Sequence, residues 1–311
     1  MYTLVGGGKI KTPISYYGGK QQLAGKIIKI LEQSPVQKMY CEPFFGGGAV
    51  FFAKKPAEIE VINDVNNCLI TFYRILKTNF NSLQKEVETS LHSRNLHRQA
   101  RVVLDNPDMF SEVKIAWAVW VLSNQSFGCG WDAGWGYDRA GETSKKIANK
   151  RLMFTETLSE RLRTAEIECY DALKIIKSRD TSDTLFYLDP PYPGTDQGHY
   201  DGYSEEDFRA LLNILQNIKG KFLLSSFFRS DKEHFKRAAL NPHKSDRSSV
   251  FIFRYDQMRN TCRSLRHIRL NPVDFIIRQK KMSCPHGCFP YIYQAVDHIL
   301  ISICCFRNFH N

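Results

Sequence analysis

Residues 184–192 of the chain read TLFYLDPPY, and this stretch predicts where the functional site lies. Its first half is β-branched and aromatic, which is typical of a buried strand, and the two prolines prevent that strand from continuing in a ladder. Asp189 and Tyr192 are therefore expected at the carboxyl end of a strand. In open α/β sheets, ligands bind at this end.

The same tetrapeptide, Asp189–Tyr192, has the groups needed to hold the exocyclic amine of a nucleobase. That nitrogen is a poor nucleophile until two acceptors hold its hydrogens, because its lone pair is delocalised into the ring. Asp189 and the carbonyl of Pro190, which Pro191 follows, would be the acceptors, and Tyr192 would stack on the base. The lone pair would then face an electrophile such as a sulfonium methyl. The alternative is a strand-ending turn in which Asp189 only caps a neighbouring group.

Length and composition fit a globular protein with a polyanionic partner. The 311 residues are 43% hydrophobic and 24% charged, enough for one large domain with an insertion or for two domains. No run of 18 apolar residues exists and residues 1–11 lack a signal-peptide segment, so we expect a cytoplasmic protein without membrane contact. The net charge of +11 favours nucleic acid as a partner. The nine cysteines show no disulfide framework and are expected to be reduced.

Two further segments predict strand ends suited to a nucleoside cofactor. Residues 39–52, MYCEPFFGGGAVFF, indicate a strand, a glycine turn that permits close backbone approach, and a helix N-terminus with free N–H groups. The spacing is not Gly-x-Gly-x-x-Gly, which disfavours an NAD-dependent oxidoreductase. Residues 58–64 predict a strand that ends at Asp64. This carboxylate suits the hydroxyls of a ribose, and it is equally placed to be the N-cap of a helix over residues 65–77.

The remaining elements alternate between strands and helices. Residues 13–20 form a turn before a helix, and Lys20 at that helix start opposes the macrodipole, so it either meets an anion such as a ligand carboxylate or is simply solvated. A strand over 165–171 ends at Asp171, before a helix over 172–178. Residues 194–203 are expected to close over a base, before a helix to Ile218 with a Ser204–Asp207 capping box and a strand over 221–226. This order predicts a mostly parallel sheet.

Residues 71–162 contain no strand signal and predict a helical insertion. Its loop, residues 123–139, combines amides, glycines and aromatics that suit base edges or a wedge in the stack, although Trp131 and Trp135 could instead fold back onto the helices. A basic helix follows, with Lys150 and Arg151 among its cations, and suits phosphates. The candidate DNA-binding residues are Asn124, Gln125, Ser126, Trp131, Arg139, Lys145 and Lys146.

Taken in order, the segments YYGGK (16–20), EPFFGGG (42–48), ND (63–64) and DPPY (189–192) resemble the Dam-type, class alpha DNA N6-adenine methyltransferases. The resemblance covers roughly residues 10–240. It implies S-adenosylmethionine as cofactor, double-stranded DNA as partner, and an α/β, Rossmann-like methyltransferase sheet built from residues 1–70 and 163–240. Residues 71–162 would be the inserted helical target-recognition domain.

The resemblance also implies roles for individual residues. Tyr16 and Lys20 would lie near the methionine part of the cofactor, Asp64 would hold its ribose, and Asp171 would meet its adenine. Asp189–Tyr192 would hold the target base. The cofactor loop would contribute Glu42, Pro43, Phe44 and Gly46, and Asp189 would also border the cofactor.

These inferences predict methyl transfer to adenine N6 in duplex DNA after the base is extruded. Transfer would be direct, because no cysteine adjoins Asp189 to act as a nucleophile. Cytosine-N4 transfer and a disabled DNA-binding homologue are the alternatives. We expect a monomer without a metal ion, and the resemblance implies a phage or restriction–modification setting with a possible restriction endonuclease counterpart.

The last 71 residues depart from this pattern. Residues 241–311 contain 11 Lys and Arg against 4 Asp and Glu, together with five cysteines. Residues 284–288 with His298 make only a weak zinc pattern. Short apolar runs at 250–253 and 299–303 are candidates for edge strands. We interpret this tail as divergent or out of frame, which predicts a sheet without its last antiparallel strands. The loop at 128–137 differs from that of GATC-specific members, so the recognised sequence stays open.

Overall fold

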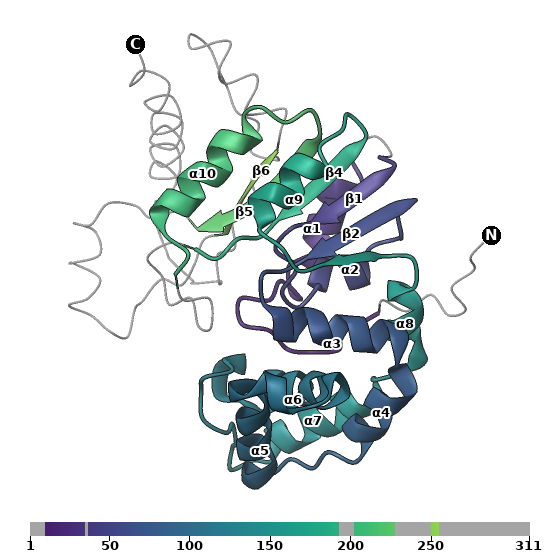
Figure 1. Ribbon diagram of the computed structural model, residues 1–311, viewed down its shortest axis with the longest axis vertical. Coiled ribbons are helices and arrows are strands. Elements are labelled where there is room, and N and C mark those ends of the chain that lie inside the picture. Colours follow the sequence, from purple (N-terminus) through teal and green to yellow (C-terminus); the bar gives the residue numbers. More distant parts are fainter. Residues whose placement is uncertain (1–9, 35–36, 193–201, 228–249, 255–311) are drawn as a thin grey trace, which may run out of the picture. The chain divides into compact units, whose positions relative to one another are not determined.

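The computed structural model describes residues 10–34, 37–192, 202–227 and 250–254. The chain divides into two units, Met1–Lys221 and Phe222–Asn311. Figure 1 shows the elements, coloured along the chain from purple to yellow. Within the described ranges, every helix is too short or too polar to cross a membrane.

A parallel sheet organises the first unit. Its strands lie in the order β3 (Glu166–Glu168), β2 (Ile59–Asn63), β1 (Met39–Glu42) and β4 (Thr184–Leu188). Strands β1 and β4 are largely buried, as expected for parallel strands with apolar runs. The predicted parallel sheet is confirmed. Because β1 lies between β2 and β4, the glycine loop, Asp64 and Asp189 all follow neighbouring strand ends.

Four helices of this unit connect or follow the strands. They are α1 (Ala24–Leu31), α2 (Ala49–Ala53), α9 (Ala172–Ser178) and α10 (Glu205–Leu215). Helix α9 has the predicted bounds. Helix α10 begins with the predicted capping box, in which the Ser204 hydroxyl accepts from the Asp207 N–H and the Asp207 carboxylate accepts from the Ser204 N–H. The helix ends at Leu215, three residues before the predicted end.

The segment between β2 and β3 is helical, as predicted. It contains α3 (Asn67–Thr78), α4 (Phe80–Glu88), α5 (Arg94–Asp105), α6 (Glu112–Gln125), α7 (Glu142–Leu152) and α8 (Glu156–Leu162), with short 3₁₀ turns at Pro107–Met109 and Phe127–Cys129. Helix α6 is the centre of the group, because all residues from Ile115 to Gln125 are buried and it packs against α3, α4, α5 and α7.

Helix α3 spans the residue at which the insertion is predicted to begin. The boundary at residue 71 falls inside this helix, which runs unbroken from Asn67 to Thr78. Helix α3 contacts α6 and also β3, and the Lys77 ammonium donates to the Ala165 carbonyl at 2.7 Å. Helix α3 therefore packs against both the helical segment and the sheet.

In the second unit, β5 (Lys221–Phe227) pairs antiparallel with β6 (Val250–Arg254), with Leu223 opposite Arg254 and Phe227 opposite Val250. The edge strand predicted at 250–253 is confirmed, so the expectation that the tail lacks an antiparallel strand is wrong at this position. The candidate strand at 299–303 and the weak zinc pattern at 284–298 lie outside the described residues.

Candidate active site

A cavity of about 540 Å³ lies at the carboxyl ends of the parallel strands. Its walls come from the turn at residues 16–20 and from the segments that follow β1, β2, β3 and β4. All the residues predicted for catalysis and cofactor binding line it. They are Tyr16, Lys20, Glu42, Pro43, Phe44, Gly46, Asp64, Asp171, Asp189, Pro190, Pro191 and Tyr192.

Asp64 presents a buried carboxylate to this cavity. Its side chain is 3% exposed, its Oδ2 accepts from the Gly46 N–H at 2.9 Å, and its Oδ1 accepts from the Asn66 N–H at 3.0 Å. Burial raises the pKa of Asp64 to about 6, although the backbone N–H groups act to lower it. The N-cap of α3 is Asn66, whose Oδ1 accepts from the Leu69 N–H at 3.1 Å. The alternative of Asp64 as N-cap is therefore wrong.

The glycine loop follows a path that side chains would block. Gly48 has φ of 64°, and a Cβ there would lie 2.6 Å from Cζ of Phe45. A Cβ on Gly47 would lie 2.8 Å from the Cβ of Tyr16. The loop thus runs directly against the segment that carries Tyr16, and the cavity beside it stays open.

Asn63, to which the sequence analysis gives no role, joins the end of β2 to the loops that follow β1 and β3. Its Nδ2 donates to the carbonyls of Pro43 at 2.9 Å and Tyr170 at 3.0 Å, and its Oδ1 accepts from the Tyr170 N–H at 2.9 Å. The side chain is fully buried. Its signals in the sequence are a polar residue at the end of an apolar strand and its place beside Asp64 in the ND segment at 63–64.

Asp189 is held from two sides. The Lys20 ammonium lies 2.8 Å from Oδ2, and the Tyr192 hydroxyl donates to Oδ1 at 3.1 Å. The ammonium also lies 5.1 Å from the centre of the Tyr192 ring. Burial acts to lower the pKa of Lys20, but Asp189 and Tyr192 outweigh it and the pKa is raised. The anion that was expected at Lys20 is thus the carboxylate of the chain's own Asp189.

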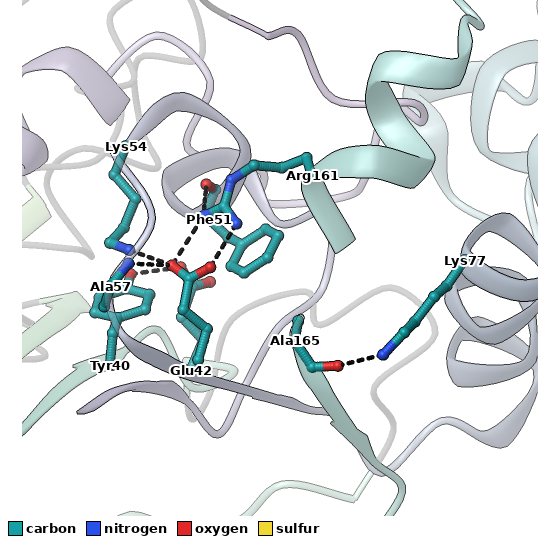
Figure 2. Close-up of polar contacts among 9 residues, drawn as sticks. Tyr40, Glu42, Phe51, Lys54, Ala57, Lys77, Arg161 and Ala165 are labelled. Atoms are coloured by element: carbon teal, nitrogen blue, oxygen red, sulfur yellow. Dashed lines mark hydrogen bonds and ion pairs between the residues drawn. The ribbon is translucent and has the colours of Figure 1, made fainter. Parts of the chain in front are cut away.

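Glu42 reaches the cavity from the end of β1 and is almost fully buried. Burial raises the pKa of Glu42 to about 8, against a hydrogen bond of 2.5 Å from the Tyr40 hydroxyl. The Lys54 ammonium lies 4.0 Å from the centre of the Tyr40 ring and bonds to Glu60. Figure 2 shows Lys54, Tyr40 and Arg161 near Glu42.

Glu60 and Arg161 form a buried ion pair between β2 and α8. Arg161 Nη1 and Nη2 lie 2.5 and 2.9 Å from the two Glu60 oxygens, and Nη2 also donates to the Phe51 carbonyl at 2.8 Å. The Arg161 and Glu60 side chains are 2% and 0% exposed. The pair therefore ties the last helix of the helical segment to the strand that positions Asp64.

Four residues predicted to bind DNA lie inside the helical segment. Asn124 accepts from the Ser15 N–H at 3.1 Å, Gln125 donates to the Leu91 carbonyl, and Ser126 bonds to His97. Trp131 is 6% exposed and donates to the Ser123 hydroxyl at 2.8 Å. Its ring meets that of Tyr16 edge-on, with centroids 5.9 Å apart. These placements favour the alternative in which Trp131 folds back, and we do not retain the four as DNA contacts.

The three predicted cations of this segment are exposed. Arg139 precedes α7, and Lys145 and Lys146 lie on that helix, where Lys145 pairs with Glu142 at 2.8 Å. The neighbouring Lys150 instead donates to the Thr12 carbonyl at 2.9 Å, and its burial lowers its pKa to about 8. Phosphate contact by Arg139, Lys145 and Lys146 stays a prediction.

The lining of the cavity fits a cationic nucleoside cofactor. The acidic side chains of Glu42, Asp64 and Asp171 line it, and the buried Asp64 carboxylate can accept further hydrogen bonds from hydroxyl groups. The Asp171 side chain accepts from the Lys174 N–H as the N-cap of α9. Among the described cysteines none lines the cavity, and no group of metal-ligating side chains occurs there in the described residues.

Comparisons with known proteins agree with this site. The model of the D12 class N6 adenine-specific DNA methyltransferase family matches residues 16–114 and 134–245. The chain is 30% identical to the type II methyltransferase M1.LlaDCHI of Lactococcus lactis subsp. cremoris over 214 residues, which cover 61% of this chain and 69% of that protein.

Two more relatives come from an archaeon and a phage. Type II methyltransferase M.MjaIII of Methanocaldococcus jannaschii is 26% identical over 263 residues, with 76% of this chain and 86% of that protein covered. The DNA N-6-adenine-methyltransferase of Escherichia phage P1 is 28% identical over 200 residues, with 62% and 25% covered. Because the family match spans most of the chain and includes every strand end of the cavity, the chain belongs to the D12 class of N6 adenine-specific DNA methyltransferases.

Proposed function

We propose that the chain transfers a methyl group from S-adenosylmethionine to N6 of an adenine that is extruded from duplex DNA into the cavity. The observation that carries the proposal is the meeting of Asp64, the glycine loop and the Asp189–Tyr192 segment in one cavity. When bound, S-adenosylmethionine supplies an electrophilic methyl group on a sulfonium.

Asp64 and the glycine loop would hold the cofactor. Asp64 would accept hydrogen bonds from the ribose hydroxyls with the lone pairs that Gly46 and Asn66 leave. Asp171 would meet the adenine, and Tyr16 would lie at the methionine part. Glu42 would face the cationic end, where its carboxylate form is favoured by positive charge.

Asp189 and the Pro190 carbonyl would accept the two hydrogens of the adenine amine. Both acceptors follow β4 directly, so the strand fixes their separation. Lys20 pairs with one carboxylate oxygen of Asp189, Oδ2. The carboxylate still has lone pairs with which it can accept a hydrogen bond from the substrate. Tyr192 would stack on the base. The N–C bond would form as the S–C bond of the sulfonium breaks, the neutral thioether would leave, and the proton of the methylated amine would pass to the Asp189 carboxylate, without a covalent enzyme intermediate.

The direct test is methyl transfer from labelled S-adenosylmethionine to unmethylated bacterial DNA, followed by nucleoside analysis of the digest. We expect the label in N6-methyladenine and none in N4-methylcytosine. DNA that is bound without gaining label would contradict the proposal and support a disabled homologue.

Substitution of Asp64 tests the cofactor part of the proposal. Asp64→Asn keeps the shape but loses the charge, so we expect affinity for S-adenosylmethionine to fall about 10-fold or more. In the wild type, affinity should fall as the pH drops through about 6, because Asp64 then becomes protonated and neutral. Isothermal titration between pH 5 and 8 measures both effects.

Asp105→Asn is the matched control, since Asp105 is exposed at the end of α5. It should bind the cofactor with the wild-type pH profile. A drop in affinity below pH 6 that persists unchanged in Asp64→Asn would show that another group titrates.

The biological setting extends the same proposal. The type II names of two relatives suggest a restriction–modification system with an endonuclease counterpart, and the phage relative suggests a phage alternative. We further propose that the chain acts as a monomer in the cytoplasm.

A further inference from the structure

Two stacked aromatic rings and one arginine lie together on the helical segment. The Trp135 and Tyr137 rings are stacked, with centroids 5.4 Å apart and planes 15° apart. The Arg94 guanidinium carbon lies 5.0 Å from the Trp135 centroid and 5.7 Å from the Tyr137 centroid. Arg94, Trp135 and Tyr137 are called the Arg94 stack below. Contacts of this kind hold a guanidinium in a fixed plane.

Hydrogen bonds hold the loop that carries Trp135 and Tyr137 in place. The Gly136 N–H donates to the Gln125 carbonyl at 2.7 Å, and the Phe127 N–H donates to the Gly134 carbonyl at 2.8 Å. His92 bonds to the Gly136 carbonyl at 2.9 Å, and its ring lies 4.6 Å from that of Trp135. The stack is therefore built on fixed backbone and needs little ordering when a partner binds.

Arg94 is exposed and forms no ion pair with any described residue, whereas Arg101 pairs with Asp132 at 2.7 Å. Tyr137 is 63% exposed. A free guanidinium on an aromatic support suits a planar acceptor or an anion, and the net charge of +11 favours DNA as the partner.

The same loop also reaches the wall of the cavity. Trp131 contacts Tyr16, which lines the cavity, and Trp135 follows four residues later, at most about 14 Å along the chain. Since base pairs in DNA are spaced about 3.4 Å apart, this span corresponds to about four base pairs. The Arg94 stack is therefore close enough to the cavity to contact the sequence around the extruded base.

We propose that Arg94 reads a guanine in the DNA sequence that the chain recognises. The inference rests on the proposed function, because it takes duplex DNA as the substrate. A guanidinium donates two parallel hydrogen bonds to O6 and N7 of guanine in the major groove, the most frequent specific contact between protein and DNA. A lysine retains the charge but lacks the rigid planar fork, so the substitution is not conservative at a bidentate contact.

The test is selection of duplexes from a random library by the full-length chain, in the wild type and in Arg94→Lys. We expect the wild type to enrich a sequence that contains guanine, and Arg94→Lys to lose preference at that one position by about 10-fold or more. Arg98→Lys is the matched control, since Arg98 is exposed one turn later on α5 and bonds to Asn95. It should keep the wild-type preference.

Two results would overturn the inference. One is an equal loss of binding to all sequences in Arg94→Lys, which would show that Arg94 contributes to affinity without reading a base. The other is the same preference in both proteins, or none in the wild type. Because the selection needs no methyl transfer, a wild type that enriches a guanine-containing sequence but methylates nothing would refute the proposed function and leave the inference standing.

Discussion

Asp189→Asn is expected to lower the rate of methyl transfer by about 10³-fold. The variant retains the shape of the side chain and one acceptor oxygen, but it loses the charge that pairs with Lys20 and that holds the amine hydrogens. Affinity for S-adenosylmethionine should change little, because Asp64 and the glycine loop lie at other strand ends. Single-turnover transfer and isothermal titration measure the two quantities separately.

The control for this variant is Asp183→Asn. Asp183 is exposed and immediately precedes β4, so it lies at the opposite end of the strand that Asp189 follows. Its replacement should leave transfer at the wild-type rate. Transfer by Asp189→Asn at more than about a tenth of the wild-type rate would remove Asp189 from the proposed chemistry, since a single positioned acceptor normally contributes more.

Arg161→Met is expected to lower the free energy of unfolding by about 3–5 kcal/mol. The substitution leaves Glu60 charged and buried, with Lys54 and the Ala57 N–H as its remaining partners among the described residues. Arg98→Met, on the exposed face of α5, is the matched control and should change stability by less than about 0.5 kcal/mol. Chemical denaturation of the full-length chain gives both values.

A double-mutant cycle shows whether the loss comes from the ion pair. Glu60→Gln removes the stranded charge, so the double variant should be less destabilised than the sum of the two single variants. If the effects simply add, the arginine stabilises the protein through its stem and through its contact with Phe51, where it lies 3.6 Å from the ring centre.

The strand ends of the site are predictable because each functional residue adjoins the apolar run that forms its strand. Asp64 and Asp189 are one residue beyond β2 and β4, so the elements and the site come from the same local pattern. The parallel sheet then brings these ends together. This is why the predicted residues that follow β1, β2, β3 and β4 line one cavity, which the turn with Tyr16 and Lys20 completes.

The helical segment is less predictable because its polar residues have distant partners. Asn124 bonds to Ser15, 109 residues away, and Arg161 bonds to Glu60, 101 residues away. An amide beside glycines and aromatics has the same local sequence whether it reads DNA or supports a loop. The distinction depends on which residues of α6 are buried, and every residue from Ile115 to Gln125 is buried.

In the loop of the helical segment, the residues that hold the backbone in place differ from those that face solvent. Gln125, Ser126 and Trp131 keep the loop in place from inside, whereas Arg94 and Tyr137 are exposed. Exposed positions can be randomised at little risk to folding, because their side chains contribute few buried contacts. A library at positions 94 and 137 is thus a compact starting point for evolving methyltransferases that mark new DNA sequences.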